Sequence, residues 1–143
     1  MKLSYVLYAS RLTVHFDRDT LNDILSTSRR NNARDGLTGF LHIEAPSVLQ
    51  LLEGPESKLR ATMTRISADP RHEDVRELAR GQFDQRYFDG WSMALVDYTT
   101  FSLADLADIR KGELDDLTTF DPLDLISVLS ANASFLRMQP AAG

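Results

Sequence analysis

The stretch Leu37–Gly54 reads LTGFLHIEAPSVLQLLEG, and it decides the fold. It contains two short apolar runs, Leu37–Ile43 and Ser47–Glu53, which are separated by Glu44-Ala45-Pro46. Short apolar runs bounded by turn residues are typical of buried strands, and so small a gap favours a hairpin over a crossover. The stretch therefore predicts two neighbouring antiparallel strands.

A strand and a helix are expected before this hairpin, and a second helix directly after it. Leu3–Ala9 is a short apolar and aromatic run, which is typical of a buried strand. Apolar residues then recur at helical spacing and stop before Gly36, which predicts a helix over about residues 20 to 32. After the hairpin, Pro55 suits a first helical position because its missing N–H is not needed there, and Asp69-Pro70 ends that helix.

Two more strands and two appended helices complete the predicted order. Val75–Phe83 and Trp91–Val96 alternate between apolar and polar residues, so both are expected to be strands. The order βαββαββ is typical of a ferredoxin-like α+β fold with both helices on one face of a mostly antiparallel sheet. Helices over Ser102–Lys111 and Asp121–Met138 follow, and we expect the last one to cover the other face.

Composition excludes several classes of site and partner. The 143 residues carry a net charge of −5 and include no cysteine, which rules out disulfides, zinc–thiolate sites, iron–sulfur clusters and cysteine nucleophiles. The three histidines are scattered, so no metal site is expected. No dense basic run is present, which disfavours nucleic acid, and no apolar run reaches the roughly 18 residues of a membrane span. We therefore expect a cytoplasmic protein.

Polar side chains fall on faces that should be buried. The apolar stripe of the first helix runs from Ile24 through Ser28 to Asn31 and Asn32, and Gln50 lies in an apolar row of its strand. A buried amide without partners costs roughly 1–3 kcal/mol, so these amides need hydrogen-bond partners. For the asparagines a role as the helix C-terminal cap stays open at this point.

A tyrosine can be the hydrogen-bond partner of the glutamine. Tyr8 shares a face of the first strand with Val6 and Ser10. Its hydroxyl and the Gln50 amide can form a hydrogen bond between neighbouring strands, and the amide retains capacity for a third partner. The pair is either a satisfied core contact or part of a binding site.

The second helix carries charges near its end. Arg65 and Asp69 are four residues apart and flank Ile66. A solvated ion pair of little energetic value is one interpretation. If the inward residues of both helices converge with Gln50, they form a slot for a flat, amide-like ligand with a charged tail. Arg29 and Arg30, near the end of the first helix, could then meet phosphates on that tail if the chain bends to face them.

From about residue 2 to 97 the sequence resembles BLUF domains, which are blue-light sensors that use FAD. Several separate motifs carry the resemblance in register: Tyr5-Val6-Leu7-Tyr8-Ala9-Ser10, Ser28-Arg29-Arg30-Asn31-Asn32, Gly36-Leu37-Thr38-Gly39, Gln50-Leu51-Leu52-Glu53-Gly54-Pro55, Asp69-Pro70-Arg71-His72 and Trp91-Ser92-Met93. The resemblance implies a photosensor domain over residues 1–97, with residues 98–143 as a helical extension for output.

The resemblance also implies which residues bind FAD and carry the photochemistry. The positions that match the family's cofactor-binding residues are Tyr8, Ser10, Ile24, Ser28, Arg29, Asn31, Asn32, Gln50, Arg65, Ile66, Asp69 and His72. In the family, the tyrosine that matches Tyr8 gives an electron and a proton after excitation. The glutamine that matches Gln50 then rotates or tautomerises. The changed hydrogen bond to flavin O4 shifts the absorption to the red.

Two family positions for signal relay match Trp91 and Met93. Strict alternation along one strand places both on the same face, and only a bulge or twist could separate them. The sequence does not decide which of the two faces the flavin. The chain also departs from the family in two places. Val48 replaces an aromatic residue, and Glu44-Ala45-Pro46 stands where a glycine turn is usual. The smaller Val48 predicts a looser flavin pocket but leaves the photochemistry intact.

The function implied is a photoreceptor without an enzymatic output domain, which signals to an unidentified protein effector as a homodimer. Leu123, Ile126 and Ala133 lie off the apolar stripe of the last helix, which would suit contact with another subunit. Two alternatives are an acylphosphatase-like hydrolase, which needs a phosphate-binding loop on exposed turns, and a colourless interaction module. FMN or riboflavin could replace FAD in a recombinant preparation.

Overall fold

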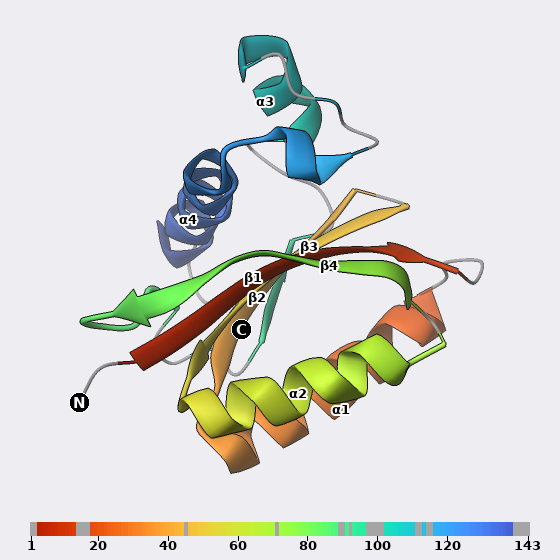
Figure 1. Cartoon of the computed structure of the whole chain (residues 1–143), viewed down its shortest axis with the longest axis vertical. Helices are drawn as coiled ribbons and strands as arrows, with labels where there is room; N and C mark the ends of the chain where they lie inside the picture. Colours follow the sequence, from red (N-terminus) through yellow and green to blue (C-terminus); the bar gives the residue numbers. More distant parts are fainter. Residues whose placement is uncertain are drawn as a thin grey trace.

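The computed structural model describes residues 3–13, 18–44, 46–70, 72–88, 91, 93–96, 102–110, 113 and 116–138. At its centre is a five-stranded sheet with the strand order β4-β1-β3-β2-β5 (Figure 1). Its strands are β1 (Leu3–Leu12), β2 (Thr38–Glu44), β3 (Ser47–Gly54), β4 (His72–Phe83) and β5 (Ala94–Val96). The pairings of β1 with β3 and β4, and of β2 with β3, are antiparallel, and the short β5 runs parallel to β2. The predicted hairpin and the α+β ferredoxin-like fold are confirmed.

Helices cover both faces of this sheet. The helices α1 (Arg18–Asp35) and α2 (Glu56–Ala68) lie on one face. On the other face lie α3 (Leu103–Arg110), a short 3-10 helix (Leu117–Thr119) and α4 (Pro122–Met138). The prediction that the last helix covers the second face is confirmed, because Leu125 and Leu129 of α4 are fully buried in one core with residues of the sheet. Within the described ranges, no helix combines the length and apolar character that a membrane crossing needs.

The first helix extends further than its pattern predicts. It ends at Asp35 because Gly36 adopts a left-handed conformation with φ of 71°. The backbone N–H of Leu37 then donates to the carbonyl of Asn32 at 2.8 Å, which closes the helix end. Asn31 and Asn32 therefore lie inside the last turns of the helix and are not its cap.

The segment before β5 differs from its prediction. A strand is expected over Trp91–Val96, but among the described residues of this segment only Ala94–Val96 form it. The alternation of side chains in a strand therefore does not apply to Trp91 and Met93. Trp91 packs beside the rings of Phe40 and Phe88 on the α4 side of the sheet. Met93 belongs to the core on the α1 and α2 side. Trp91 and Met93 therefore lie on opposite faces of the sheet, and the strict alternation that would put them on one face is wrong.

The off-stripe residues of α4 are also not all surface residues. Ile126 and Ala133 are buried in the core between α4 and the sheet, whereas Leu123 is 69% exposed. Of these apolar side chains, only Leu123 remains available to another subunit.

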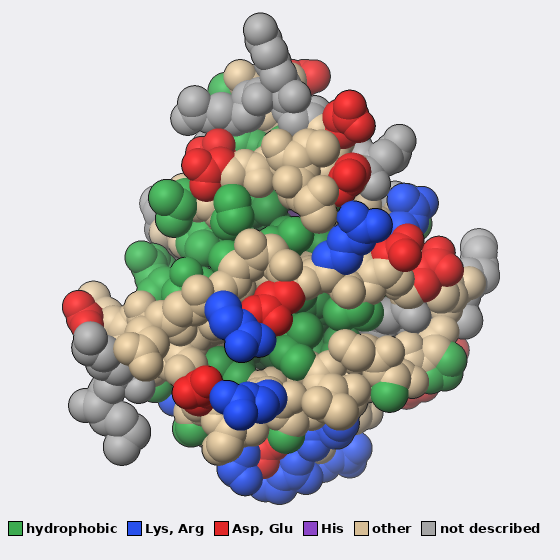
Figure 2. Space-filling view, viewed as in Figure 1, with side chains coloured by type: hydrophobic (Ala, Val, Ile, Leu, Met, Phe, Trp, Pro, Cys, Tyr) green, Lys and Arg blue, Asp and Glu red, His purple; other side chains and the backbone are tan. Residues whose placement is uncertain are grey.

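Charge is distributed unevenly over the two faces. In Figure 2, Lys and Arg side chains gather over α1 and α2, while several Asp and Glu side chains lie over the region of α3. This basic cluster lies on the side of the sheet that carries α1 and α2, although the net charge of the chain is −5.

Glu44 connects the end of β2 to the start of α3. Its carboxylate accepts hydrogen bonds from His42 Nε2, at 2.7 Å, and from the backbone N–H of Leu103. Partial burial raises the pKa of Glu44, but these hydrogen bonds outweigh it and hold the pKa below its usual range. The anion therefore stabilises the N-terminus of α3.

We expect Glu44→Ala to lower the free energy of unfolding by about 1 kcal/mol at pH 7. A carboxyl whose pKa is lowered by folding stabilises above its unfolded pKa, so the difference from the native sequence should shrink as the pH falls below about 4. Urea unfolding at several pH values measures this, with the exposed Asp108→Ala of α3 as the control. A loss that is the same at every pH would show that the charge is not responsible.

Candidate functional site

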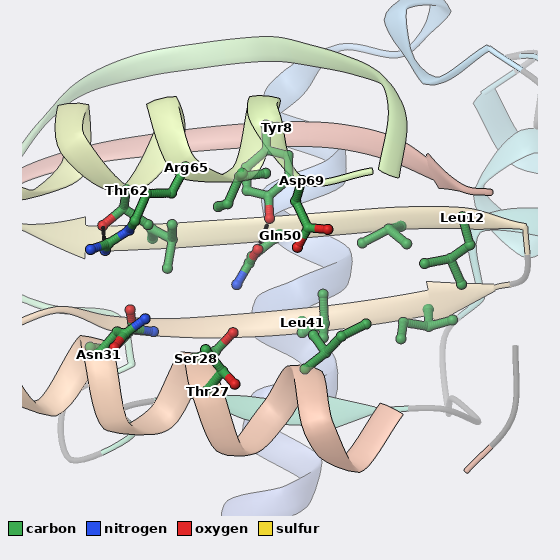
Figure 3. A pocket seen from close by; sticks show the side chains of 16 residues that line it. Tyr8, Leu12, Thr27, Ser28, Asn31, Leu41, Gln50, Thr62, Arg65 and Asp69 are labelled. Carbon is green, nitrogen blue, oxygen red and sulfur yellow. Dashed lines mark hydrogen bonds between the residues drawn. The ribbon is translucent and has the colours of Figure 1, made fainter. Parts of the chain in front are cut away.

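A cavity that opens to solvent lies between α1, α2 and the sheet (Figure 3). Side chains from both helices and from β1, β2 and β3 line it. They are Tyr8, Leu12, Ile24, Thr27, Ser28, Asn31, Asn32, Leu41, Ile43, Val48, Gln50, Leu52, Thr62, Arg65, Ile66 and Asp69. Most of the lining is apolar, with amide, hydroxyl and charged groups at a few places, as is common in small-molecule sites.

Tyr8 and Gln50 form the floor of the cavity. They lie directly opposite each other on β1 and β3, and the Tyr8 hydroxyl donates a hydrogen bond to Gln50 Oε1. Gln50 Nε2 donates to the sulfur of Met93 at 3.2 Å. Burial, assisted by the negative charge of Asp69, raises the pKa of Tyr8, so the phenol is protonated at neutral pH. The hydrogen bond expected from the strand pattern is confirmed.

The two helices supply the walls. Asn32 is only 2% exposed and Asn31 is partly buried, and both line the cavity from α1 as the helical spacing predicts. Ile24 of α1 and Ile66 of α2 add an apolar side chain from each helix. This set fits a flat ring with apolar faces and a hydrogen-bonding edge, because amides can both donate and accept at that edge.

Arg65 has a different ion-pair partner from the one its spacing indicates. Its guanidinium lies 3.6 Å from the carboxylate of Asp35 on α1 and donates to Thr62 Oγ1 at 3.0 Å. The ion pair therefore connects α2 to α1, whereas the sequence spacing indicates Asp69 as the partner. Since the Arg65 side chain is 47% exposed, it lies where a ligand's polar tail could meet it.

Three of the predicted ligand residues do not line the cavity with described side chains. Ser10 is buried opposite Val48 but is not part of the lining. Arg29 donates from Nε to the backbone carbonyl of Met93 at 3.0 Å. His72 begins β4, but its side chain lies outside the described residues.

The structure adds lining residues that the sequence reasoning missed, namely Leu12, Thr27, Leu41, Ile43, Leu52 and Thr62. Periodicity held a signal for some of them. Leu41 and Ile43 alternate along β2, and Thr62 lies one helical turn before Ile66. Among the described residues, no three His, Asp or Glu side chains gather to hold a metal ion.

Comparison with known sequences identifies a family and several relatives. The family model for BLUF, described as sensors of blue light using FAD, matches residues 3–94. The photoactivated adenylate cyclase subunit beta of Euglena gracilis is 28% identical over 98% of this chain and 17% of its own length. The blue light- and temperature-regulated antirepressor of Escherichia coli K12 is 30% identical over 66% of this chain and 24% of its own length. The chain thus spans less than a quarter of these two relatives.

Solved structures agree with the family match over a longer range. The dark state of BlrB, a BLUF protein, superposes with a TM-score of 0.75 at 27% identity and covers 94% of this chain and 97% of its own. The photo-activated state of BlsA has a TM-score of 0.79 at 22% identity, covers 99% of both chains and supports the fold alone. This chain belongs to the BLUF family, the sensors of blue light that use FAD.

Proposed function

We propose that this chain is a blue-light photoreceptor in which Tyr8 and Gln50 carry out the photochemistry of non-covalently bound FAD. The observation that supports this most directly is the hydrogen bond from Tyr8 to Gln50 at the floor of the cavity. With its oxygen directed at Tyr8, the glutamine can offer a second N–H to a ligand in the cavity.

Residues on the cavity walls are the proposed FAD ligands. Asn31 and Asn32 would bind the polar edge of the isoalloxazine, and Ile24 and Ile66 would pack against its faces. Arg65 would bind a ring carbonyl or the side chain of the cofactor.

The remaining predicted ligands depend on the resemblance to the family to different degrees. Ser28 and Asp69 line the cavity and are proposed contacts of the cofactor's side chain. Roles for Ser10 and His72 in binding stay predictions. Arg29 is not proposed as a ligand, because it does not line the cavity and its Nε donates to the backbone carbonyl of Met93.

The proposed photochemistry uses groups that suit it. Bound FAD supplies absorption of blue light and an excited acceptor for one electron and one proton. Tyr8 gives one electron from its phenol and loses its hydroxyl proton through the adjacent Gln50 amide. Both return to Tyr8, so no net product forms. Gln50 ends rotated or tautomerised, because its amide presents an acceptor and two donors that can exchange places.

The helices beyond β5 are the proposed output. We treat residues 98–143 as an extension of the sensor of residues 1–97, because Leu125 and Leu129 of α4 share one core with Leu7 and Leu49 of the sheet. The signal would pass through β5, which continues from Met93 beside Gln50 and pairs with β2. We propose a homodimer that signals to a protein effector, with no enzymatic, membrane or nucleic-acid activity of its own. A cytoplasmic location stays a prediction that fractionation of the native host would test.

An absorption spectrum of the purified protein in darkness, during blue illumination and through dark recovery tests the function. We expect a flavin spectrum that shifts to the red and returns. Chromatography of the released cofactor distinguishes FAD from FMN or riboflavin. Bound flavin without a shift would contradict the proposed photochemistry, and a colourless protein that binds no added FAD would favour the interaction module.

Asn32→Ala should weaken FAD binding by roughly tenfold or more, because a buried hydrogen bond to the ring edge is lost. Titration of flavin fluorescence against the folded apoprotein measures this. Asn22→Ala is the matched control, since Asn22 lies exposed on the same helix. Equal affinity of the two variants would remove Asn32 from the proposed binding set.

A further inference from the structure

We infer that Arg29 is a positioning residue for the Gln50 side chain and acts on it through Met93. The inference rests on the proposed photochemistry of Gln50, and it gives Arg29 a role other than binding the cofactor.

A chain of contacts runs from the surface of α1 to the floor of the cavity. Arg29, an exposed residue of α1, donates from Nε to the backbone carbonyl of Met93 at 3.0 Å. The Met93 sulfur accepts from Gln50 Nε2 at 3.2 Å, and Gln50 Oε1 accepts from the Tyr8 hydroxyl. Arg29 and Met93 are separated by 64 residues along the chain, so only the tertiary fold brings them together.

The backbone of Met93 needs such an anchor. Met93 precedes β5, whose pairing with β2 begins at Ala94, so its carbonyl is outside the parallel ladder. β5 itself is three residues long and lies at the edge of the sheet. The hydrogen bond from the Arg29 guanidinium therefore holds Met93, the residue that leads into β5, against α1.

The Met93 side chain has a defined place as well. It is only 4% exposed, and its methyl carbon would lie 3.4 Å from a Cβ placed on Gly39 of β2. The same Cβ would lie 2.7 Å from the carbonyl oxygen of Leu51, so glycine at position 39 keeps this region open. The sulfur is thus held by its backbone anchor on one side and by close packing on the other.

This anchor selects one orientation of the Gln50 amide. A thioether sulfur can only accept a hydrogen bond, and weakly, so it favours the amide nitrogen on its side and the amide oxygen toward Tyr8. The reversed amide would place its oxygen beside the sulfur, where neither atom can donate. Arg29 therefore stabilises the arrangement seen here and drives the return of Gln50 to it after illumination.

The test compares Arg29→Ala with Arg30→Ala, its exposed neighbour of equal charge on the same helix, in the FAD-loaded protein. We expect Arg29→Ala to keep its affinity for FAD and its red shift. Its dark recovery should be slower than that of the native sequence by about threefold or more, which is the size of effect expected for residues coupled through direct contacts. Arg30→Ala should recover like the native sequence. In a Met93→Ala background, Arg29→Ala should cause no further change.

Three results would overturn the inference. The first is a dark recovery of Arg29→Ala that equals that of the native sequence. The second is an effect of Arg29→Ala on recovery that is as large in the Met93→Ala background as in the native sequence. The third is a loss of FAD affinity in Arg29→Ala that by itself accounts for the slower recovery. The Gln50 side-chain amide resonance in dark, FAD-loaded protein gives a second readout that needs no photochemistry. It should move in Arg29→Ala and stay in place in Arg30→Ala even if illumination produces no red shift. The inference and the proposed function can therefore fail separately.

Discussion

Tyr8→Phe should leave FAD bound and abolish the light-induced red shift. Phenylalanine retains the shape of the ring at the floor of the cavity, so the packing of the site is preserved. It removes the hydroxyl that donates to Gln50 Oε1, and with it the transferable proton and most of the reducing power of the side chain. The measurement is a difference spectrum between illuminated and dark protein, with FAD content determined on the same sample.

Tyr5→Phe is the matched control for that experiment. Tyr5 lies on the same strand but stacks on the ring of Phe83, with centroids 4.0 Å apart, and it does not line the cavity. Its substitution should leave the red shift unchanged. A red shift that survives in Tyr8→Phe would overturn the role of Tyr8, and a shift lost in both variants would indicate a general disturbance of β1.

Glu53→Ala should lower the free energy of unfolding by about 3 kcal/mol, a large part of the stability of an ordinary domain. Glu53 is fully buried on β3, and its carboxylate accepts from the backbone N–H groups of Tyr87 and Phe88 at 2.9 and 2.7 Å. It also accepts from Thr38 Oγ1 at 3.0 Å. The substitution removes the acceptor of the buried Phe88 N–H and of the part-buried Tyr87 N–H, and the loss at Phe88 is the principal cost.

Urea unfolding measures this loss, and Glu56→Ala is the matched control. Glu56 forms its ion pair with Arg60 at the surface, where such a pair contributes less than about 1 kcal/mol. If the two substitutions destabilise the protein equally, the carboxylate of Glu53 does not anchor the segment after β4.

Most elements of the fold could be predicted because their signals are local. The hairpin within Leu37–Gly54 follows from two short apolar runs and the turn between them, and the second helix from Pro55 and Asp69-Pro70. Its boundaries were less predictable where a tertiary contact or a single backbone conformation decides them. The helix α1 continues to Asp35, where the positive φ of Gly36 ends it. The strand β5 is shorter than the alternating pattern of the sequence indicates.

The candidate site was predictable to the extent that periodicity assigns side chains to faces. The helical period directed Asn31 and Asn32 inward, and the strand period put Tyr8 and Gln50 on a common face. Periodicity assigns a side chain to one face of its own helix or strand. It does not identify the residues of other elements that the side chain contacts. The length and freedom of an arginine side chain make its partner especially hard to predict, as Arg65 shows by pairing with α1.

By itself, the sequence determined the order of the elements, the inward polar residues and the resemblance to a family, because each is encoded in neighbouring residues or in the spacing of motifs. Only the tertiary structure decided that Met93 and not Trp91 adjoins Gln50, and that Arg29 holds the Met93 backbone. The physical reason is that these contacts join residues far apart in the chain, and strand register and helix packing select them. No local pattern of residues records that selection.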